Sequence, residues 1–166
     1  MFPELLMKNL IIYTNMTQKC NCKLFNRNFE FQHDNRKIVS FKDQGHATEY
    51  RYENKRSDYL AKYKIDQGLI SDNGAKCDFL LLNCQQKQAY FIELKGSDIS
   101  RSIEQIDRSI DKLLPYLSGF SCYARIVLSR VNTIALKNPK FLKLDKKIKS
   151  LRGDLKKQCR LLEETN

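Results

Sequence analysis

The stretch AYFIELKG, residues 89–96, decides the fold because it has the pattern of a buried strand that ends in charge. Three apolar residues, YFI, are followed by Leu94, and Glu93 and Lys95 interrupt this apolar end. Burying an unpaired charge is expensive, so charged residues in a core strand are usually paired, bound to a metal or placed at a functional cleft. The stretch therefore predicts a central strand with a functional site at its end.

The flanking sequence places this strand in a hairpin and leads it into a helix. The apolar run KCDFLLLN (76–83) predicts a preceding strand, and CQQKQ (84–88) predicts the turn. After Gly96, Ser97 or Asp98 is expected to cap a helix. Apolar residues then recur at steps of three and four from Ile99 to Leu117, which indicates one buried helical face. SCYARIVLSR (121–130) predicts a further strand.

The remaining segments have less regular patterns. NRNFEFQ (26–32) and RKIVSF (36–41) predict short strands. The segment 48–70 fits a helix or strands, and its periodicity does not choose between them. Asn138 and Pro139 begin a helix, which is expected to continue as a long, basic, amphipathic helix over 139–163, bent near Gly153. The order of elements predicts an α/β (α+β) fold, with a mixed central sheet flanked by helices.

Length and composition limit the class of protein. The chain has 166 residues, 42% of them apolar, which predicts a single domain over 1–166. No apolar run approaches the roughly 20 residues of a transmembrane helix, so no membrane partner is expected. The start MFPELLMKNLII is expected to pack on the core and not to be a signal peptide. The chain has no Walker-type glycine loop and no hydrolase serine elbow.

The charge is strongly positive and unevenly distributed. The net charge is +11, and residues 137–160 contribute +8 of it, with ten Lys or Arg against two Asp. Such a basic field attracts polyanions, nucleic acid first, although a basic helical face also serves solubility alone. The residues predicted to contact nucleic acid are Lys143, Lys146, Lys147, Lys149 and Arg152.

Six cysteines are scattered along the chain. The pair Cys20 and Cys22 is too closely spaced for the usual zinc knuckle, and only His33 follows nearby. A structural zinc is therefore weakly indicated. Reduced thiols and a cytoplasmic location are the simplest expectation.

The hairpin is expected to place two carboxylates side by side. Asp78 stands at the head of one strand, and Glu93 lies near the end of its antiparallel neighbour. Adjacent carboxylates repel unless positive charge lies between them. Lys95 supplies part of that charge, and a divalent ion with oxygen ligands would supply the rest. Mg²⁺ is commonly held by one or two carboxylates together with water and substrate phosphate.

These residues resemble the PD-(D/E)xK nuclease superfamily, which has the restriction-endonuclease-like fold. The match comprises Asp78, the triplet Glu93-Leu94-Lys95, and Gln105 on the following helix, within residues 63–130. Cys77 departs from the Pro that many members carry. The resemblance implies a nuclease-like core over residues 46–135. The resemblance implies a metal-dependent nuclease acting on nucleic acid, with DNA more expected than RNA, in repair, recombination or defence.

The resemblance also implies roles for these residues. Asp78, Glu93 and the Leu94 carbonyl would bind Mg²⁺ or Mn²⁺, and Lys95 would orient the attacking water. Gln105 would position the lysine or the water, and the products would be a 5′-phosphate and a 3′-hydroxyl. Members usually carry a further acid on the first core helix; the candidates are Glu49, Glu53 and Asp66, of which Glu53 is included in the predicted site.

Other interpretations stay open. Glu93 and Lys95 also fit a salt pair on an edge strand. The chain also fits a non-catalytic nucleic-acid-binding or scaffold subunit that retains the nuclease fold. A third interpretation is a protein-interaction domain whose C-terminal helix docks on a partner. A homodimer or a place in a larger complex is expected, because nothing in so short a chain resembles a separate recognition domain.

Overall fold

A computed structural model describes residues 23–45, 47–95, 97–130 and 138–166, without the side chain of Lys95. The elements, in chain order, are β1 (Phe29–Asp34), β2 (Ile38–Lys42), β3 (Glu49–Glu53), β4 (Leu60–Lys64), β5 (Phe79–Asn83), β6 (Gln88–Lys95), α2 (Ile99–Leu113), a 3₁₀ turn (Leu114–Tyr116), β7 (Ser121–Leu128), α3 (Pro139–Ser150), β8 (Leu155–Cys159) and β9 (Leu161–Thr165).

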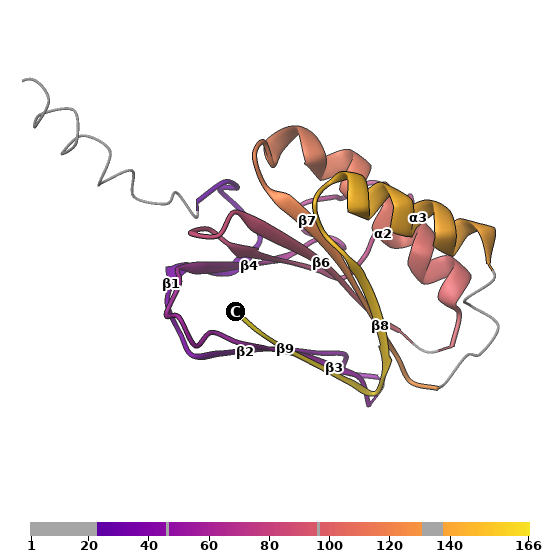
Figure 1. Cartoon of the computed structure of the whole chain (residues 1–166), viewed down its shortest axis with the longest axis horizontal. Coiled ribbons are helices and arrows are strands. Elements are labelled where there is room, and N and C mark those ends of the chain that lie inside the picture. Colours follow the sequence, from indigo (N-terminus) through magenta and orange to yellow (C-terminus); the bar gives the residue numbers. More distant parts are fainter. Residues whose placement is uncertain (1–22, 46, 96, 131–137) are drawn as a thin grey trace, which may run out of the picture.

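The described chain forms three layers around a large central sheet. The large sheet has the strand order β1-β4-β5-β6-β7-β8, and a small sheet has the order β2-β3-β9. β1, β4, β5 and β6 pair antiparallel, whereas β6, β7 and β8 pair parallel. Figure 1 shows α2 and α3 on one face of the large sheet and the small sheet on the other. The predicted mixed sheet and α+β class are confirmed, although the helices cover only one face.

The two faces of the central strand β6 serve two different cores. Ala89 and Phe91 pack toward the helices, whereas Tyr90, Ile92 and Leu94 pack toward the small sheet. Successive side chains of a strand point to opposite faces, so a strand covered on both sides is apolar at nearly every position. This double coverage explains the unbroken YFI run of the sequence.

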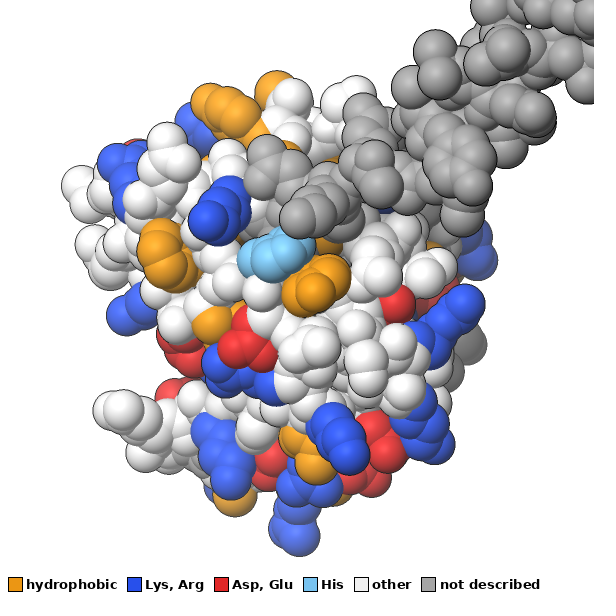
Figure 2. Space-filling model, turned by 90° about the vertical axis from the view of Figure 1, so that its left-hand side faces the viewer, with side chains coloured by type: hydrophobic (Ala, Val, Ile, Leu, Met, Phe, Trp, Pro, Cys, Tyr) orange, Lys and Arg blue, Asp and Glu red, His pale blue; other side chains and the backbone are white. Residues whose placement is uncertain are grey.

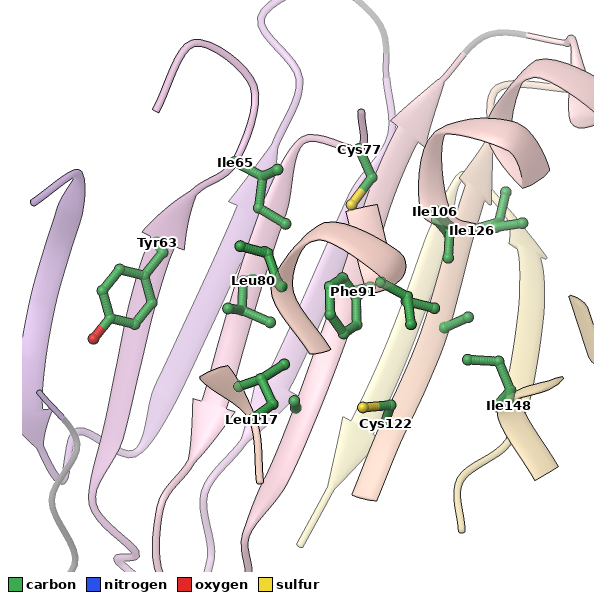
Figure 3. Packing of buried hydrophobic residues seen from close by; sticks show 14 of the residues in the cluster. Tyr63, Ile65, Cys77, Leu80, Phe91, Ile106, Leu117, Cys122, Ile126 and Ile148 are labelled. Carbon is green, nitrogen blue, oxygen red and sulfur yellow. The ribbon is translucent and has the colours of Figure 1, made fainter. Parts of the chain in front are cut away.

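The core beneath the helices depends on the apolar stripe of α2. Ile103, Ile106 and Ile110 are at most 2% exposed, and Figure 3 shows Ile106 beside Ile126, in the same cluster as Phe91. The helix begins as predicted, because the Asp98 side chain accepts a hydrogen bond from the backbone N–H of Arg101. The predicted helix after Gly96 is thus confirmed.

The segment that sequence periodicity left open consists of two strands. β3 and β4 occupy residues 49–53 and 60–64, in the small and the large sheet respectively. Tyr50 and Tyr52 are fully buried between the two sheets. Their two-residue spacing is therefore the strand period, and the helical interpretation of this segment is wrong.

The predicted C-terminal helix over 139–163 is wrong beyond Ser150. It begins as expected, with the Asn138 side chain accepting from the N–H of Lys140, but α3 ends at Ser150 and the chain continues as β8 and β9. Arg152 has a positive φ of 62°, which breaks the helix. A side chain at Gly153 would collide with the Cys122 carbonyl, so glycine permits the close approach that starts β8.

The cysteines only partly follow the expectation of reduced thiols. Cys77, Cys122 and Cys159 are free, whereas Cys84 is disulfide-bonded. Disulfides persist mainly in oxidising compartments. Because Cys84 is bonded, the cysteines no longer support the prediction of a cytoplasmic location. The predictions for Cys20, Cys22 and the first twelve residues lie outside the described residues.

No described helix combines the length and apolar character that crossing a membrane requires.

Candidate functional site

The hairpin brings Asp78 and Glu93 together. β5 and β6 pair antiparallel from Phe79 opposite Ile92 to Asn83 opposite Gln88, as the sequence predicted. Continuing this register by one residue sets Asp78 opposite Glu93. Residues directly opposite in an antiparallel pair have their Cβ atoms about 4.5–5.5 Å apart, so the two acids are neighbours.

Backbone hydrogen bonds fix Asp78 from both sides. Its Oδ2 accepts from the N–H of Leu94 at 2.8 Å, and its carbonyl accepts from the N–H of Ile65 at 2.9 Å. Asp78 therefore joins the ends of β4, β5 and β6. The Leu94 bond consumes acceptor capacity on one carboxylate oxygen, and it orients the group toward the end of β6.

Glu93 lies on the helix-covered face of the sheet and is 0% exposed. It shares this face with Phe91, two residues earlier in β6. Cys77 is close enough for the negative charge of Glu93 to affect its thiol. Burial raises the pKa of the Cys77 thiol well above its usual range, and the negative charges of Glu93 and Asp78 raise that pKa further. Asp78, Glu93 and Cys77 thus form one electrostatic cluster beneath α2.

Gln105 connects α2 to this cluster. It is only 5% exposed, and its Nε2 donates to the carbonyl of Lys76 at 2.8 Å. Its Oε1 is buried and accepts no hydrogen bond from the described residues. One turn later, the Ser109 hydroxyl accepts from the N–H of Cys77 at 2.9 Å. Gln105 is therefore a buried residue beside the hairpin and not part of the exposed helical surface.

Sequence reasoning missed Lys76. Its side chain is 6% exposed, and its Nζ donates to the carbonyls of Asp72 and Gly74 and lies 3.7 Å from Asp66 Oδ1. A lysine two residues before a strand acid has the same pattern as a surface charge, and no sequence signal marks it as buried. Through this contact, the Asp66 carboxylate lies near the ammonium group of Lys76, two residues before Asp78 in the sequence.

Glu53 does not join the site. It lies in β3, a strand of the small sheet on the opposite side of the large sheet, and its side chain is 52% exposed beside Lys55. Glu49 lies in the same strand, where it accepts from the Ser40 hydroxyl. Of the three candidate acids, Asp66 alone follows the β4 end that Asp78 contacts. The expectation for Glu53 is therefore corrected: β3 carries its two acids away from the hairpin.

The donor set suits a hard divalent ion with few protein ligands. Asp78 and Glu93 supply carboxylate oxygens, and Gln105 Oε1 is a buried oxygen with free acceptor capacity in the described structure. Within the described ranges, no group of three or more His, Cys, Asp and Glu is arranged to hold a metal. Two carboxylates fit the sparse protein ligation of Mg²⁺ but not a full protein cage.

The basic residues expected to hold nucleic acid divide into two groups. Lys147 bridges Asp107 and Asp111 of α2 at 2.5 and 2.7 Å, and Lys149 pairs with Asp145 at 2.6 Å. Lys147 in particular joins α3 to α2, and its charge is compensated by these two acids.

The other three predicted contacts remain on the surface. Lys143 and Lys146 are exposed, and neither lies within 4 Å of a carboxylate in the part of the chain that the structure describes. Arg152 donates to the carbonyl of Gly119 at 3.1 Å. On the side of the molecule shown in Figure 2, basic side chains are interspersed with acidic and apolar ones and do not merge into one field.

A second buried ionic cluster, also missed, lies on the other face of the large sheet. Arg125 of β7 is 1% exposed and bonds both oxygens of Glu164 at 2.6 and 2.7 Å, with Asp154 a further 2.7 Å partner. Burial acts to raise the pKa of Glu164, but the Arg125 hydrogen bonds and charge outweigh it and lower that pKa. Arg125 lies within an apolar strand and Glu164 just beyond the segment 139–163 that was predicted as helix, so the sequence did not pair them.

Comparison with models of protein families, with curated proteins and with solved structures finds no match.

Proposed function

We propose that the protein is a metal-dependent nuclease whose active site is the Asp78–Glu93 end of the central hairpin. The single observation that carries this proposal is the β5–β6 register, which makes two acids neighbours at a strand end. Paired carboxylates at such a place are costly, because like charges repel and burial penalises each of them. A divalent ion between them would offset that cost.

The order of elements around the hairpin supports the resemblance to the PD-(D/E)xK superfamily. β5, β6, α2 and β7 follow one another as strand, strand, helix and strand, and α2 carries Gln105 to the hairpin. The restriction-endonuclease-like assignment remains part of this proposal.

The residues would divide the work as follows. Asp78, Glu93 and the Leu94 carbonyl would hold Mg²⁺ or Mn²⁺, which supplies Lewis acidity and lowers the pKa of a bound water. Lys95 would hold and orient the attacking water and stabilise the charge that develops on the phosphoryl oxygens. Gln105 would position these groups from α2, with Asp66 in place of Glu53 as the further acid.

The proposed substrate is a nucleic acid, with DNA favoured over RNA. The net charge of +11 attracts phosphates, and Lys143 and Lys146 are the α3 cations placed to contact them. Removing one lysine that binds a phosphate should reduce the salt slope of binding by about one. The double variant Lys143→Ala/Lys146→Ala should therefore bind with a shallower slope, measured by anisotropy over a salt series, whereas Lys147→Ala should leave the slope unchanged.

Cleavage assays test the proposal. Labelled single-stranded, duplex and branched DNA and RNA are incubated with Mg²⁺, Mn²⁺ or EDTA and wild-type protein, Glu93→Gln or Lys95→Ala. We expect metal-dependent cutting by the wild type and a loss of at least about a hundredfold in both variants. Glu163→Gln and Lys37→Ala are matched controls at exposed sites and should cut normally. Equal cutting by the wild type and Glu93→Gln would refute the assignment.

Two observations favour a second candidate, a non-catalytic subunit that retains this fold. Glu93 is 0% exposed, and Asp78 bonds the Leu94 backbone as a purely structural residue could. A divalent ion separates the two candidates. An active site should give a Mg²⁺- or Mn²⁺-dependent thermal shift that disappears in Asp78→Asn, and a scaffold should give no shift in either protein.

A further inference from the structure

The outer edge of β8 is open. β8 is the last strand of the large sheet, farthest from β1, and no strand in the described ranges pairs with its outer side (Figure 1). Ala124 N–H donates to the Asp154 carbonyl at 3.0 Å, and Arg160 N–H donates to the Leu128 carbonyl at 2.7 Å. Alternate residues of a parallel strand bond to the same neighbour. The even-numbered residues therefore face β7, and Leu155, Lys157 and Cys159 direct their backbone groups outward.

A surface cavity of about 580 Å³ adjoins this edge and extends from the helix layer to the small sheet. Its apolar lining comes from three elements: Phe141 of α3, Leu155 of β8, and Leu161 and Leu162 of β9. Leu161 is 37% exposed. Apolar surface of this kind beside an open strand can receive the side chains of an added strand.

The uncompensated charge at this edge is positive. Glu163 also lines the cavity, but it pairs with Arg51 at 2.7 Å. Lys157 lies 5.6 Å from the centre of the Phe141 ring, and Arg160 follows at the end of β8. Neither Lys157 nor Arg160 has a carboxylate within 4 Å in the described part of the chain. An acidic partner would therefore find cations here that no protein carboxylate neutralises.

We propose that the β8 edge binds an extended peptide segment of another protein, one that carries both acidic and apolar residues. Such a strand would bond the outward backbone groups, place apolar side chains in the cavity and set carboxylates near Lys157 and Arg160. A second copy of this chain fits less well, because pairing β8 with itself brings lysines toward lysines, an arrangement that protects edges from self-association. Nucleic acid would leave the backbone edge unused.

The test is selection of a phage-displayed random peptide library on the immobilised full-length protein, followed by affinity measurements on the enriched peptides by fluorescence anisotropy. Three variants are compared. Lys157→Pro removes an outward N–H without touching the bonds to β7, Lys157→Glu reverses the charge while keeping the strand, and Lys37→Glu reverses an exposed charge elsewhere. Circular dichroism and thermal melting confirm that each variant is folded.

We expect enriched peptides to combine acidic and apolar residues and to lose about tenfold or more in affinity for Lys157→Pro and Lys157→Glu, with Lys37→Glu unchanged. Amide resonances of Leu155, Lys157 and Cys159 should shift on titration. Enriched peptides that lack this pattern, or that bind Lys157→Pro as well as the wild type, would overturn the proposal. Two other results would also overturn the proposal. One is a concentration-dependent dimer of the protein that Lys157→Pro abolishes. The other is that Lys157→Glu weakens the binding of oligo-dT but not the binding of the enriched peptides.

Discussion

Two clusters of charged residues, each with one fully buried member (Glu93 and Arg125), lie on opposite faces of the same sheet, on neighbouring strands. On the small-sheet face, Glu164 receives a bidentate contact from Arg125 and a third hydrogen bond from the Tyr50 hydroxyl at 2.8 Å. On the helix face, the hairpin makes Asp78 and Glu93 neighbours. The first arrangement pairs an acid with a buried guanidinium, and the second places two acids opposite each other on paired strands.

The two arrangements differ in how much capacity their acids have left to bind a ligand. A buried acid bonded by a planar guanidinium is already satisfied and has little capacity for a ligand. Neighbouring acids can be stabilised further by a bound cation, which is what a metal-dependent enzyme requires. We therefore propose a structural role for the Arg125–Glu164 cluster and a functional role for the Asp78–Glu93 pair.

The largest expected effect comes from removing Arg125. Arg125→Met leaves the carboxylate of Glu164, 11% exposed, inside the protein without its main partner. Breaking a buried ion pair from one side costs about 3–5 kcal/mol, measured as the free energy of unfolding in urea. The control is Arg51→Met, which breaks a more exposed pair with Glu163 and should cost less than about 1 kcal/mol. Equal losses in the two variants would contradict the structural role.

A smaller effect is expected in the pH dependence of stability. The pKa of Glu164 in the folded protein is lowered from its ordinary value of 4.5. Its contribution is therefore present above pH 4.5 and is lost as the pH falls through that value toward the folded pKa. In Glu164→Gln, we expect the acid-side loss of stability to be smaller than in the wild type, measured by urea unfolding from neutral pH to pH 3. An unchanged acid limb would show that Glu164 is not the group responsible.

The smallest effect should have the opposite sign. Glu93→Gln removes one of two repelling charges, and functional sites often sacrifice stability, so this variant should gain about 1 kcal/mol in EDTA. Differential scanning calorimetry measures the change, with Glu163→Gln as the exposed control. A loss of stability as large as that of Arg125→Met would show that both clusters are structural.

Sequence patterns predicted local structure well where one period dominated. The YFI run, the Asn83–Gln88 turn and the isoleucine stripe of α2 each fit a single period, and the hairpin register followed from them. They failed after Ser150, because Leu151 and Leu155 fit a helix and a strand alike. The close approach of Gly153 to Cys122, which decides between the two, is a tertiary contact.

The candidate site was predictable in part for the same reason. Asp78 and Glu93 are joined by a short hairpin, so their sequence positions determine their proximity. Glu53 was misplaced because membership of a second sheet depends on pairing with β9, more than a hundred residues away. Arg125 is bonded by Asp154 and Glu164, 29 and 39 residues away, and Lys76 by carbonyls of the preceding turn. Nothing in the immediate sequence of either residue distinguishes it from a surface cation.

The most direct test of the central claim is a Mn²⁺ titration of the full-length protein followed by electron paramagnetic resonance. Wild type, Asp78→Asn, Glu93→Gln and Arg125→Met are compared, the last because it alters the other cluster alone. The account predicts saturable Mn²⁺ binding by the wild type, competition by Mg²⁺, loss of binding in both hairpin variants and retention in folded Arg125→Met. Wild-type binding that persists in Asp78→Asn and Glu93→Gln, or no specific binding at all, would contradict it.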